Sequence, residues 1–493
     1  SLVLFNSIEF LIFLPIVFIL YWIMPKKYRW IILLIASYIF YMYWNWKLVF
    51  LILFTTIVSY ICSLLVEKFQ EKKGLKRGVV IVSTILCLGV LLFFKYFNFF
   101  YEIIEDIKKA ISGQGFGGYF VIMLPVGISF YTFQTLSYVI DVYRGNMKAE
   151  KHFGYYALFV SFFPQLVAGP IERPQDLLPQ LKKEQSFKKI DYSGAFRYML
   201  IGAFKKVAVA DMIGIIVNAT YSNVADANGL MILISTFLFA FQIYCDFSGY
   251  SDIAVGTAKL FGINLTENFN SPYQSKSIKE FWNRWHISLS KWLRDYIYFP
   301  LGGSRVSKIR WCFNILVVFF ISGLWHGASY NFVIWGLLHA GFQIIGALTL
   351  KQRNKLWCKI KLNPEGKFVG AVRLCITFLL VDFTWIFFRA NSISDSATAI
   401  TKLFTDWSFN LEYFKYTWSQ LGLSLPLWIY SIFGILIMLT LEKLKKIHVE
   451  QNRIYKNSIF RFGCYLILGW CLIYSWIYLQ ATDVGSSFIY FQF

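Results

Sequence analysis

His326 lies between two apolar runs, in the stretch Gly323-Leu-Trp-His-Gly-Ala-Ser. Residues 312–325 carry no charge, and as a helix they would rise about 21 Å. Because the hydrocarbon core of a bilayer is about 30 Å thick, a helix that enters at Trp311 would place His326 inside the membrane. An ionisable side chain at that depth is typical of a functional site, and a hydrogen-bonded packing histidine is the alternative interpretation.

A neutral imidazole can take a proton from a hydroxyl while the oxygen attacks an acyl carbonyl, so acyl transfer is the chemistry that such a histidine could perform. His286 is the second histidine in an unusual setting, and like His326 it follows a tryptophan. His152 and His448 lie beside lysines and are interpreted as solvated surface residues. His339 is interpreted as a helix-packing residue.

Carboxylates form a second set of candidates. Asp246 and Asp252 follow an apolar run, but their six-residue spacing does not place both on one helical face. Gly249 between them indicates a break, so a paired-carboxylate device is not expected. Orientation of a histidine, or bonding to backbone amides at a helix start, is the role that the sequence favours.

Other chemistries lack their motifs. The sequence contains no G-x-S-x-G elbow, which leaves Ser329 as a weak nucleophile candidate, and it has neither a P-loop nor a dinucleotide fingerprint. The eight cysteines form no C-x-x-C pair and fall mostly within apolar runs. We therefore expect neither a disulfide framework nor a metal site.

Composition indicates what must position these residues. Of 493 residues 57% are apolar, 20% are aromatic and only 15% are charged, whereas soluble domains are nearer 25% charged. The net charge is +21. We expect the excess basic residues to lie in the cytoplasmic loops of a polytopic membrane protein rather than in a nucleic-acid site. The first hydrophobic run, Ile8–Met24, lacks the basic n-region and the cleavage site of a signal peptide, so we expect it to be a retained membrane span.

Hydrophobic runs predict about a dozen crossings or partial crossings, without an internal repeat or a soluble domain. The runs are Ile8–Met24, Trp30–Trp44, Leu48–Val66, Val79–Phe99, Gly154–Ala168, Phe196–Asn218, Leu230–Cys245, Cys312–Trp325, Phe332–Leu348, Ala371–Phe388, Leu427–Leu441 and Phe462–Tyr478. Basic clusters follow at 26–29, 68–77, 182–206, 276–310, 351–373 and 443–461, while Arg389–Pro426 is poor in bases. The positive-inside rule then places both termini and Arg389–Pro426 outside the cell.

Two further segments are neither simple spans nor simple loops. Tyr119–Val142 is apolar but is interrupted by Pro125 and Gly127, which predicts a re-entrant or broken helix lining a cavity. Phe281–Ile297 carries one stripe of tryptophans and another of charged residues, which predicts an amphipathic helix at the cytoplasmic interface with its indoles at headgroup level.

These segments carry a family resemblance. Several blocks in order resemble the signature blocks of the membrane-bound O-acyltransferase family, and the match runs from Phe5 to about Ala390. The blocks are Leu124-Pro-Val-Gly-Ile-Ser-Phe-Tyr-Thr-Phe-Gln, Phe163-Pro-Gln-Leu-Val-Ala-Gly-Pro-Ile, Asp246-Phe-Ser-Gly-Tyr-Ser-Asp, Phe281-Trp-Asn-Arg-Trp-His-Ile-Ser-Leu-Ser, Trp292-Leu-Arg-Asp-Tyr, Pro300-Leu-Gly-Gly-Ser-Arg, Gly323-Leu-Trp-His-Gly-Ala and Trp385-Ile-Phe-Phe-Arg-Ala. The branch that acts on alginate, peptidoglycan and other exopolysaccharides is the most similar. Gln165 departs from the histidine often expected in the alginate branch, which points to a different acceptor.

The resemblance implies an all-α fold, with a ring of tilted helices around a funnel, re-entrant elements and interfacial helices. It implies one multi-span domain over 1–493, with N-terminal spans in 1–110, the acyltransferase core in 119–390, and a C-terminal loop and last spans in 391–493. His326 would match the family's catalytic histidine, and His286 the second histidine on the cytoplasmic side of the tunnel. Residues of the matching blocks are the candidates for the substrate tunnel, namely Trp285, Asn283, Arg294, Asp295, Trp325, Tyr244, Asp246, Ser248 and Gln242.

Acetyl-CoA would then be the cytoplasmic acyl donor, without a metal. An extracytoplasmic, esterase-like partner protein would place the acetyl group on a polysaccharide, and the chain would lie in the bacterial cytoplasmic membrane in contact with lipid. D-alanyl transfer to teichoic acid is the nearest alternative, since that membrane subunit shares both histidine blocks. A polysaccharide-associated transporter would also need intramembrane polar residues, but it would usually consist of two similar halves. A scaffold for a polysaccharide synthase would need neither histidine.

Overall fold

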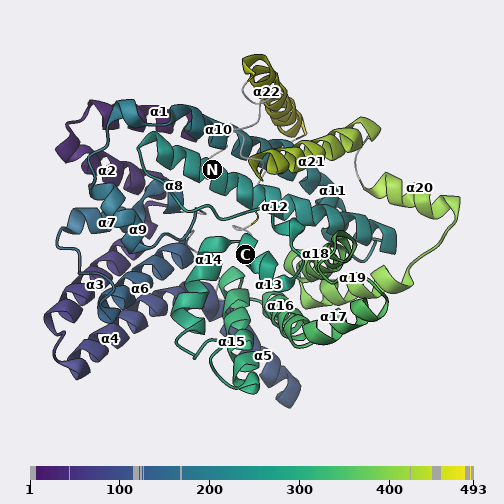
Figure 1. Cartoon of the computed structure of the whole chain (residues 1–493), viewed down its shortest axis with the longest axis horizontal. Coiled ribbons are helices and arrows are strands. Elements are labelled where there is room, and N and C mark those ends of the chain that lie inside the picture. The colour runs from purple at the N-terminus through teal and green to yellow at the C-terminus, as the bar shows by residue number, and fades with distance from the viewer. Residues whose placement is uncertain are drawn as a thin grey trace. The chain divides into compact units, whose positions relative to one another are not determined.

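A computed structural model describes residues 7–43, 45–114, 122, 125, 127–166, 169–421, 424–446, 457–482 and 489. These residues form helices and no strand. The helices are α1 (Ile8–Ile23), α2 (Arg29–Met42), α3 (Val49–Lys68), α4 (Lys73–Leu91), α5 (Phe97–Ser112), α6 (Ile128–Arg144), α7 (Phe153–Ser161), α8 (Phe163–Leu166), α9 (Pro174–Lys182), α10 (Tyr192–Ala203), α11 (Met212–Tyr221), α12 (Gly229–Leu260), α13 (Ile278–Arg284), α14 (Ile287–Leu293), α15 (Lys308–His326), α16 (Tyr330–Leu348), α17 (Leu350–Lys359), α18 (Lys367–Arg389), α19 (Ile393–Thr405), α20 (Leu411–Gln420), α21 (Leu425–Lys446) and α22 (Ser458–Ala481) (Figure 1).

The predicted all-α membrane architecture is confirmed. Within the described ranges eight helices are long and apolar enough to cross a membrane. They cover 46–68, 73–112, 229–260, 308–326, 330–348, 367–389, 425–444 and 458–481. The remaining predicted runs form shorter or interrupted helices, such as α1, which has 16 residues. The run predicted over Gly154–Ala168 is not one helix, because α7 ends at Ser161 and α8 begins at Phe163.

The chain divides into two compact units, and the first comprises residues 1–199 and 253–266. In this unit α6 is buried along nearly its whole length between α3 and α4. Hydroxyls join α3 to its neighbours, since Ser63 Oγ donates to Tyr138 Oη of α6 at 3.1 Å and Ser59 Oγ lies 2.6 Å from Tyr156 Oη of α7. The C-terminal end of α12 belongs to this unit because the Tyr21 hydroxyl donates to the Phe261 carbonyl.

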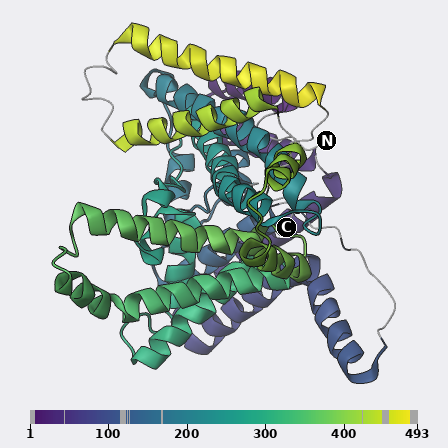
Figure 2. The same ribbon diagram turned by 90° about the vertical axis from the view of Figure 1, so that its right-hand side faces the viewer.

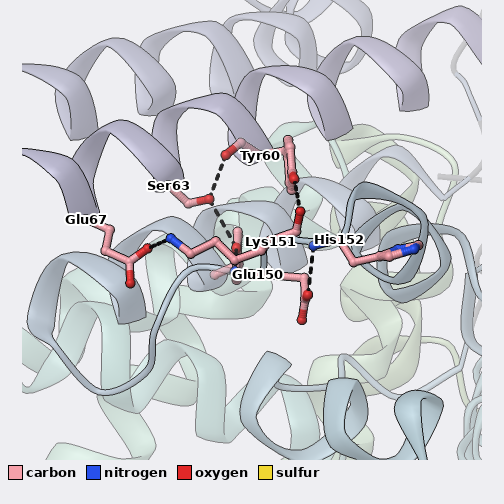
Figure 3. Close-up of polar contacts among 7 residues, drawn as sticks. Tyr60, Ser63, Glu67, Glu150, Lys151 and His152 are labelled. Carbon is pink, nitrogen blue, oxygen red and sulfur yellow. Dashed lines mark hydrogen bonds and ion pairs between the residues drawn. The ribbon is translucent and has the colours of Figure 1, made fainter.

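The segment that precedes α7 is fixed to α3 by polar contacts (Figure 3). The Tyr60 hydroxyl donates to the Lys151 carbonyl at 2.7 Å, and the Lys151 ammonium pairs with Glu67. His152 is exposed, and its Nδ1 accepts a backbone N–H from the first turn of α7. The interpretation of His152 as a surface residue is therefore confirmed, and His448 lies outside the described residues.

The second unit comprises residues 200–252 and 267–493 and contains both unusual histidines. Here α16 packs against α15 and α18, and Figure 2 shows these green helices running alongside one another. The last two helices are joined by the Tyr430 hydroxyl of α21, which donates to the Cys471 carbonyl of α22 at 2.9 Å. Among the residues that the structure describes, three π-helical stretches interrupt the regular helices, at Leu92–Tyr96 in the first unit and at Phe204–Asp211 and Arg294–Tyr298 in the second.

The break predicted at Gly249 is wrong, because α12 continues through it for 32 residues. A Cβ at Gly249 would lie 2.6 Å from the Gly202 carbonyl oxygen. The glycine is therefore required for the close approach of the neighbouring helix, and its permissive backbone is not used for a turn here.

The continuous helix predicted over Phe281–Ile297 is also wrong. α13 ends at Arg284, α14 begins at Ile287, and the chain turns sharply at the two residues between them. The tryptophans of this stripe are buried in protein and do not face lipid headgroups, with exposed fractions of 7% for Trp282 and 0% for Trp285. The position of the segment at the cytoplasmic interface stays a prediction.

Two other predicted segments are partly regular. Arg389–Pro426 contains α19 and α20, apart from its residues 422 and 423, which are not described. In Tyr119–Val142, α6 begins directly after Gly127, whose φ is +75°. Most residues before Gly127 in that segment lie outside the described part of the chain. The membrane orientation and the division of the chain into an acyltransferase core and flanking spans stay predictions.

Candidate functional site

His326 is the last residue of α15 and is 2% exposed. The rise from Arg310 at the other end of this helix is about 24 Å, so a bilayer-spanning α15 carries the imidazole deep into the apolar layer. Glycines hold α15 close to α16: a Cβ at Gly323 would lie 2.3 Å from the Phe332 carbonyl oxygen, and one at Gly336 would lie 2.3 Å from the Phe319 carbonyl oxygen. The position of His326 therefore depends on a crossing at which both backbones nearly touch.

His286 occupies the sharp turn between α13 and α14 and is fully buried. Its φ of +44° lies in the left-handed region, which costs about 1–3 kcal/mol for a residue with a side chain. Asn268 holds this turn, because its carbonyl accepts the Ile287 N–H at 2.9 Å and its side-chain oxygen accepts the Ser288 N–H at 3.1 Å. Strained backbone of this kind concentrates at functional sites.

The two histidines face each other within the second unit. Their ring centroids are 6.2 Å apart with an interplanar angle of 65°. The Trp325 indole contacts both, at 5.3 Å from His286 and 5.0 Å from His326. The structure thus brings together three of the candidate residues, although His286 precedes the adjacent Trp325 and His326 by 39 and 40 positions in the sequence.

Aromatic rings surround the pair. His326 packs edge-on against Trp335 at 4.9 Å and Phe388 at 5.5 Å, and His286 packs against Phe247 at 4.7 Å. Burial lowers the pKa of His286 from 6.5 to about 3, because an imidazolium would lose its hydration there. At neutral pH His286 is therefore an uncharged ring that can donate or accept a hydrogen bond but is a weak base.

Asp246 belongs to a buried ion cluster. Its carboxylate lies 2.6 Å from the Lys206 ammonium, which also lies 2.8 Å from Asp211. Its second oxygen accepts the Ile489 N–H at 2.7 Å. Both carboxylate oxygens therefore have partners other than a histidine, and the expected role in orienting a histidine stays a prediction. Asp252 pairs in the same way with Lys205 at 2.8 Å.

Of the other tunnel candidates, those on α12 are buried or half-buried, whereas Asn283 and Arg294 are exposed. Tyr244 is buried, packs on Trp285 with a centroid separation of 6.1 Å, and donates its hydroxyl proton to the carboxylate of Glu442. Ser248 is buried and Gln242 is half-buried on α12. Asn283 and Arg294 are exposed, and Arg294 pairs with its neighbour Asp295 at 2.9 Å, so these side chains lie on the surface and outside the aromatic enclosure.

Sequence reasoning missed the residues that enclose the pair and fix its turn. Trp335 was visible only as an aromatic residue of an apolar run, Phe247 and Phe388 only as members of the family blocks without a role of their own, and Asn268 as a loop residue. His339 is a buried packing residue, as interpreted from the sequence, and its ring nitrogens lie 3.2 Å from Trp282 Nε1 and 3.0 Å from Thr384 Oγ1.

The helices and the buried histidine pair describe a multi-pass membrane protein with an enclosed polar site. The family model for membrane-bound O-acyltransferases matches residues 38–381. The chain is also 36% identical over 415 residues to the probable alginate O-acetylase AlgI of Pseudomonas syringae pv. tomato, which covers 82% of this chain and 76% of that protein. The chain therefore belongs to the membrane-bound O-acyltransferase family and is an acyltransferase of the membrane.

Two other relatives are named for the transfer of different acyl groups. The peptidoglycan O-acetyltransferase of Helicobacter pylori is 34% identical over 436 residues, covering 81% of this chain and 79% of that protein. The teichoic acid D-alanyltransferase of Bacillus subtilis is 29% identical over 278 residues, covering 54% of this chain and 69% of that protein. The two relatives whose names specify acetyl transfer are thus similar to a larger share of this chain than the D-alanyltransferase is.

Proposed function

We propose that this chain is an O-acetyltransferase of the bacterial cytoplasmic membrane. It passes an acetyl group from cytoplasmic acetyl-CoA through a tunnel to an extracytoplasmic acceptor, for O-acetylation of a cell-surface or secreted polysaccharide. The observation that carries the proposal is the buried His286–His326 pair, with ring centroids 6.2 Å apart, in a chain similar to alginate and peptidoglycan O-acetylases.

In the proposed reaction His326 is the general base. One of its ring nitrogens takes the proton of the acceptor hydroxyl as that oxygen attacks the carbonyl carbon of the acetyl thioester. The new C–O bond forms, the C–S bond breaks, and the departing thiolate takes the proton from His326, so that coenzyme A leaves as a thiol. His326 is neutral again at the end of the turnover, and the proton of the acceptor hydroxyl is then on the thiol of coenzyme A.

His286 has a different role in this proposal. Because burial lowers its pKa to about 3, it is too weak a base to compete for the hydroxyl proton near pH 7. A neutral imidazole can instead donate a hydrogen bond to the thioester oxygen, where negative charge develops during attack. The exposed Lys291 and Arg294 on the same segment are suited to the phosphates of coenzyme A at the cytoplasmic entrance, and anionic lipid is the competing ligand for both bases.

The acceptor side of the site is proposed from the predicted orientation of the membrane. An acceptor would reach His326 from outside, so no domain motion is required to carry acetyl across the membrane. An extracytoplasmic, esterase-like partner is proposed to complete the transfer to the polymer. D-alanyl transfer is the second candidate, supported by the Bacillus subtilis relative over 54% of this chain, and a donor comparison between acetyl-CoA and a D-alanyl carrier protein separates the two.

The decisive experiment replaces His326. His326→Ala, His326→Asn and His326→Gln should each lower acetyl transfer by about 10²–10⁴-fold, because an amide donates a hydrogen bond but cannot take up the proton. The matched control is His152→Ala, since His152 is exposed and should be dispensable. Labelled acetyl-CoA and purified protein in lipid discs report the rate. Transfer above a few per cent of wild type in either amide variant would refute the assignment of His326 as the base.

A further inference from the structure

His339 lies on α16 at a junction of three helices. The Trp282 indole Nε1–H of α13 donates to His339 Nδ1 at 3.2 Å, and His339 Nε2 lies 3.0 Å from Thr384 Oγ1 of α18. All three side chains are buried, with exposed fractions of 7% for Trp282 and 0% for the other two.

The roles of the donors and acceptors follow from the chemistry of the groups. An indole nitrogen can only donate, so His339 Nδ1 must be an acceptor without a proton. In a neutral ring the proton is then on Nε2, which donates to Thr384 Oγ1. The threonine hydroxyl is able to accept this bond because its own proton goes to the Val381 carbonyl at 2.7 Å. The network therefore fixes one tautomer of His339.

The surroundings of His339 argue against proton exchange. A second proton on Nδ1 would point at the indole N–H, and the ring lies nearly parallel to Phe281 and Phe319, with interplanar angles of 11° and 12°. A ring with both nitrogens bonded and its faces against aromatic rings is suited to holding helices in place rather than to acid–base work.

Each of the three helices that His339 joins leads to the histidine pair. α13 ends directly before the Trp285–His286 turn. On α16 the Trp335 ring packs against His339 at 4.9 Å and against His326 at 4.9 Å. On α18 Thr384 is followed one turn later by Phe388, which contacts His326 at 5.5 Å.

We infer that His339 is a positioning residue of the acetyl-transfer site, whose fixed hydrogen bonds to Trp282 and Thr384 set the distance between His286 and His326. This inference rests on the proposed function of that pair. A neutral histidine is suited to this junction because it offers one acceptor and one donor on a rigid ring, whereas phenylalanine offers neither.

The test uses three substitutions that remove these bonds separately. His339→Phe keeps a ring but removes both hydrogen bonds, Thr384→Val removes one with little change of shape, and Trp282→Phe removes the other. A misplacement of about 1 Å can lower a rate by about 100-fold, so His339→Phe should lower kcat by roughly 10–100-fold. The KM for acetyl-CoA should change by less than about threefold, because no contact to the donor is removed.

Thr384→Val should also lower kcat, but by a smaller factor than His339→Phe. This variant keeps the test valid if His339→Phe does not fold. His152→Phe, at an exposed histidine, is the matched control and should keep the wild-type kcat. The kcat of the double variant Trp282→Phe/His339→Phe should be no lower than that of His339→Phe alone, because both changes remove the hydrogen bond between Trp282 and His339. Losses that multiply would overturn the inference.

Two further readouts separate positioning from other roles. The pH dependence of the residual rate in His339→Phe should keep its wild-type midpoint, and a shifted midpoint would make His339 an acid–base group. An unchanged rate per folded molecule would make it a packing residue only. If His326→Ala retains transfer, the proposed function fails. If His326→Ala is inactive while His339→Phe is fully active, only this inference fails.

Discussion

A single methyl group at Gly323 should slow acetyl transfer through geometry alone. Gly323 lies one turn before His326, and a Cβ there would lie 2.3 Å from the Phe332 carbonyl oxygen, whereas ordinary contact begins near 3.4 Å. The obstructing atom is backbone within α16, so it cannot rotate away, and α15 must move by about 1 Å. Because a 1 Å error in a reacting group can cost about 100-fold, Gly323→Ala should lower kcat by roughly that factor.

The assay is turnover of labelled acetyl-CoA by protein purified into lipid discs, expressed per folded molecule. Gly346→Ala on α16 is the matched control, because a Cβ there meets no atom within 4 Å and alanine favours a helix by up to about 1 kcal/mol. That control should keep the wild-type kcat and at least the wild-type stability. A Gly323→Ala enzyme that turns over at more than about one third of the wild-type rate would refute the reasoning.

Three further predictions concern stability and topology. Since burial lowers the pKa of His286 to about 3, this residue takes up a proton between pH 6.5 and pH 3 only in the unfolded state. Its own contribution should therefore lower the free energy of unfolding as the pH drops, by about 2 kcal/mol at pH 5. His286→Asn, which tolerates the left-handed turn, should lose less over the same range in thermal unfolding, and an equal loss would contradict the prediction. Lys206→Met leaves two buried aspartates without their cation and should destabilise by about 3–5 kcal/mol, which an unchanged melting temperature in detergent would exclude. Cysteines placed in 351–367 should react with an impermeant thiol reagent only from the cytoplasm and those in 389–426 only from outside, and the reverse pattern would invert the proposed orientation.

Much of the fold could be predicted from hydrophobic runs, because an apolar run in lipid has to form a helix to satisfy its backbone. The runs 312–325, 332–348 and 371–388 became α15, α16 and α18, whose ends differ from the predicted ends by at most four residues. The prediction failed where a run contains an internal turn, as at Phe162 between α7 and α8. Hydropathy averaged over a window cannot detect a single non-helical residue.

The site was predictable in its central residue and less so in its surroundings. His326 could be identified from the sequence because it is an ionisable residue at the end of an uncharged apolar run. The turn at His286 depends on Asn268, which is 18 residues earlier in the sequence, so no local pattern indicates it. The tryptophan stripe was misread because an interfacial helix and a buried helix share one period, and only packing distinguishes them.

The ion cluster on α12 has a consequence for biogenesis. The helical segment from Tyr192 to Tyr221 carries Lys205 and Lys206, and one lysine costs about 3 kcal/mol at the centre of a lone membrane helix. The partner of Lys205, Asp252, lies 47 residues later, which takes roughly 2–9 s to synthesise at 5–20 residues per second. Until then the segment has no counter-charge for this lysine. We therefore expect it to wait beside the insertion machinery or at the membrane surface and to enter the bilayer together with α12, so that translation speed over these residues sets when the second unit can assemble.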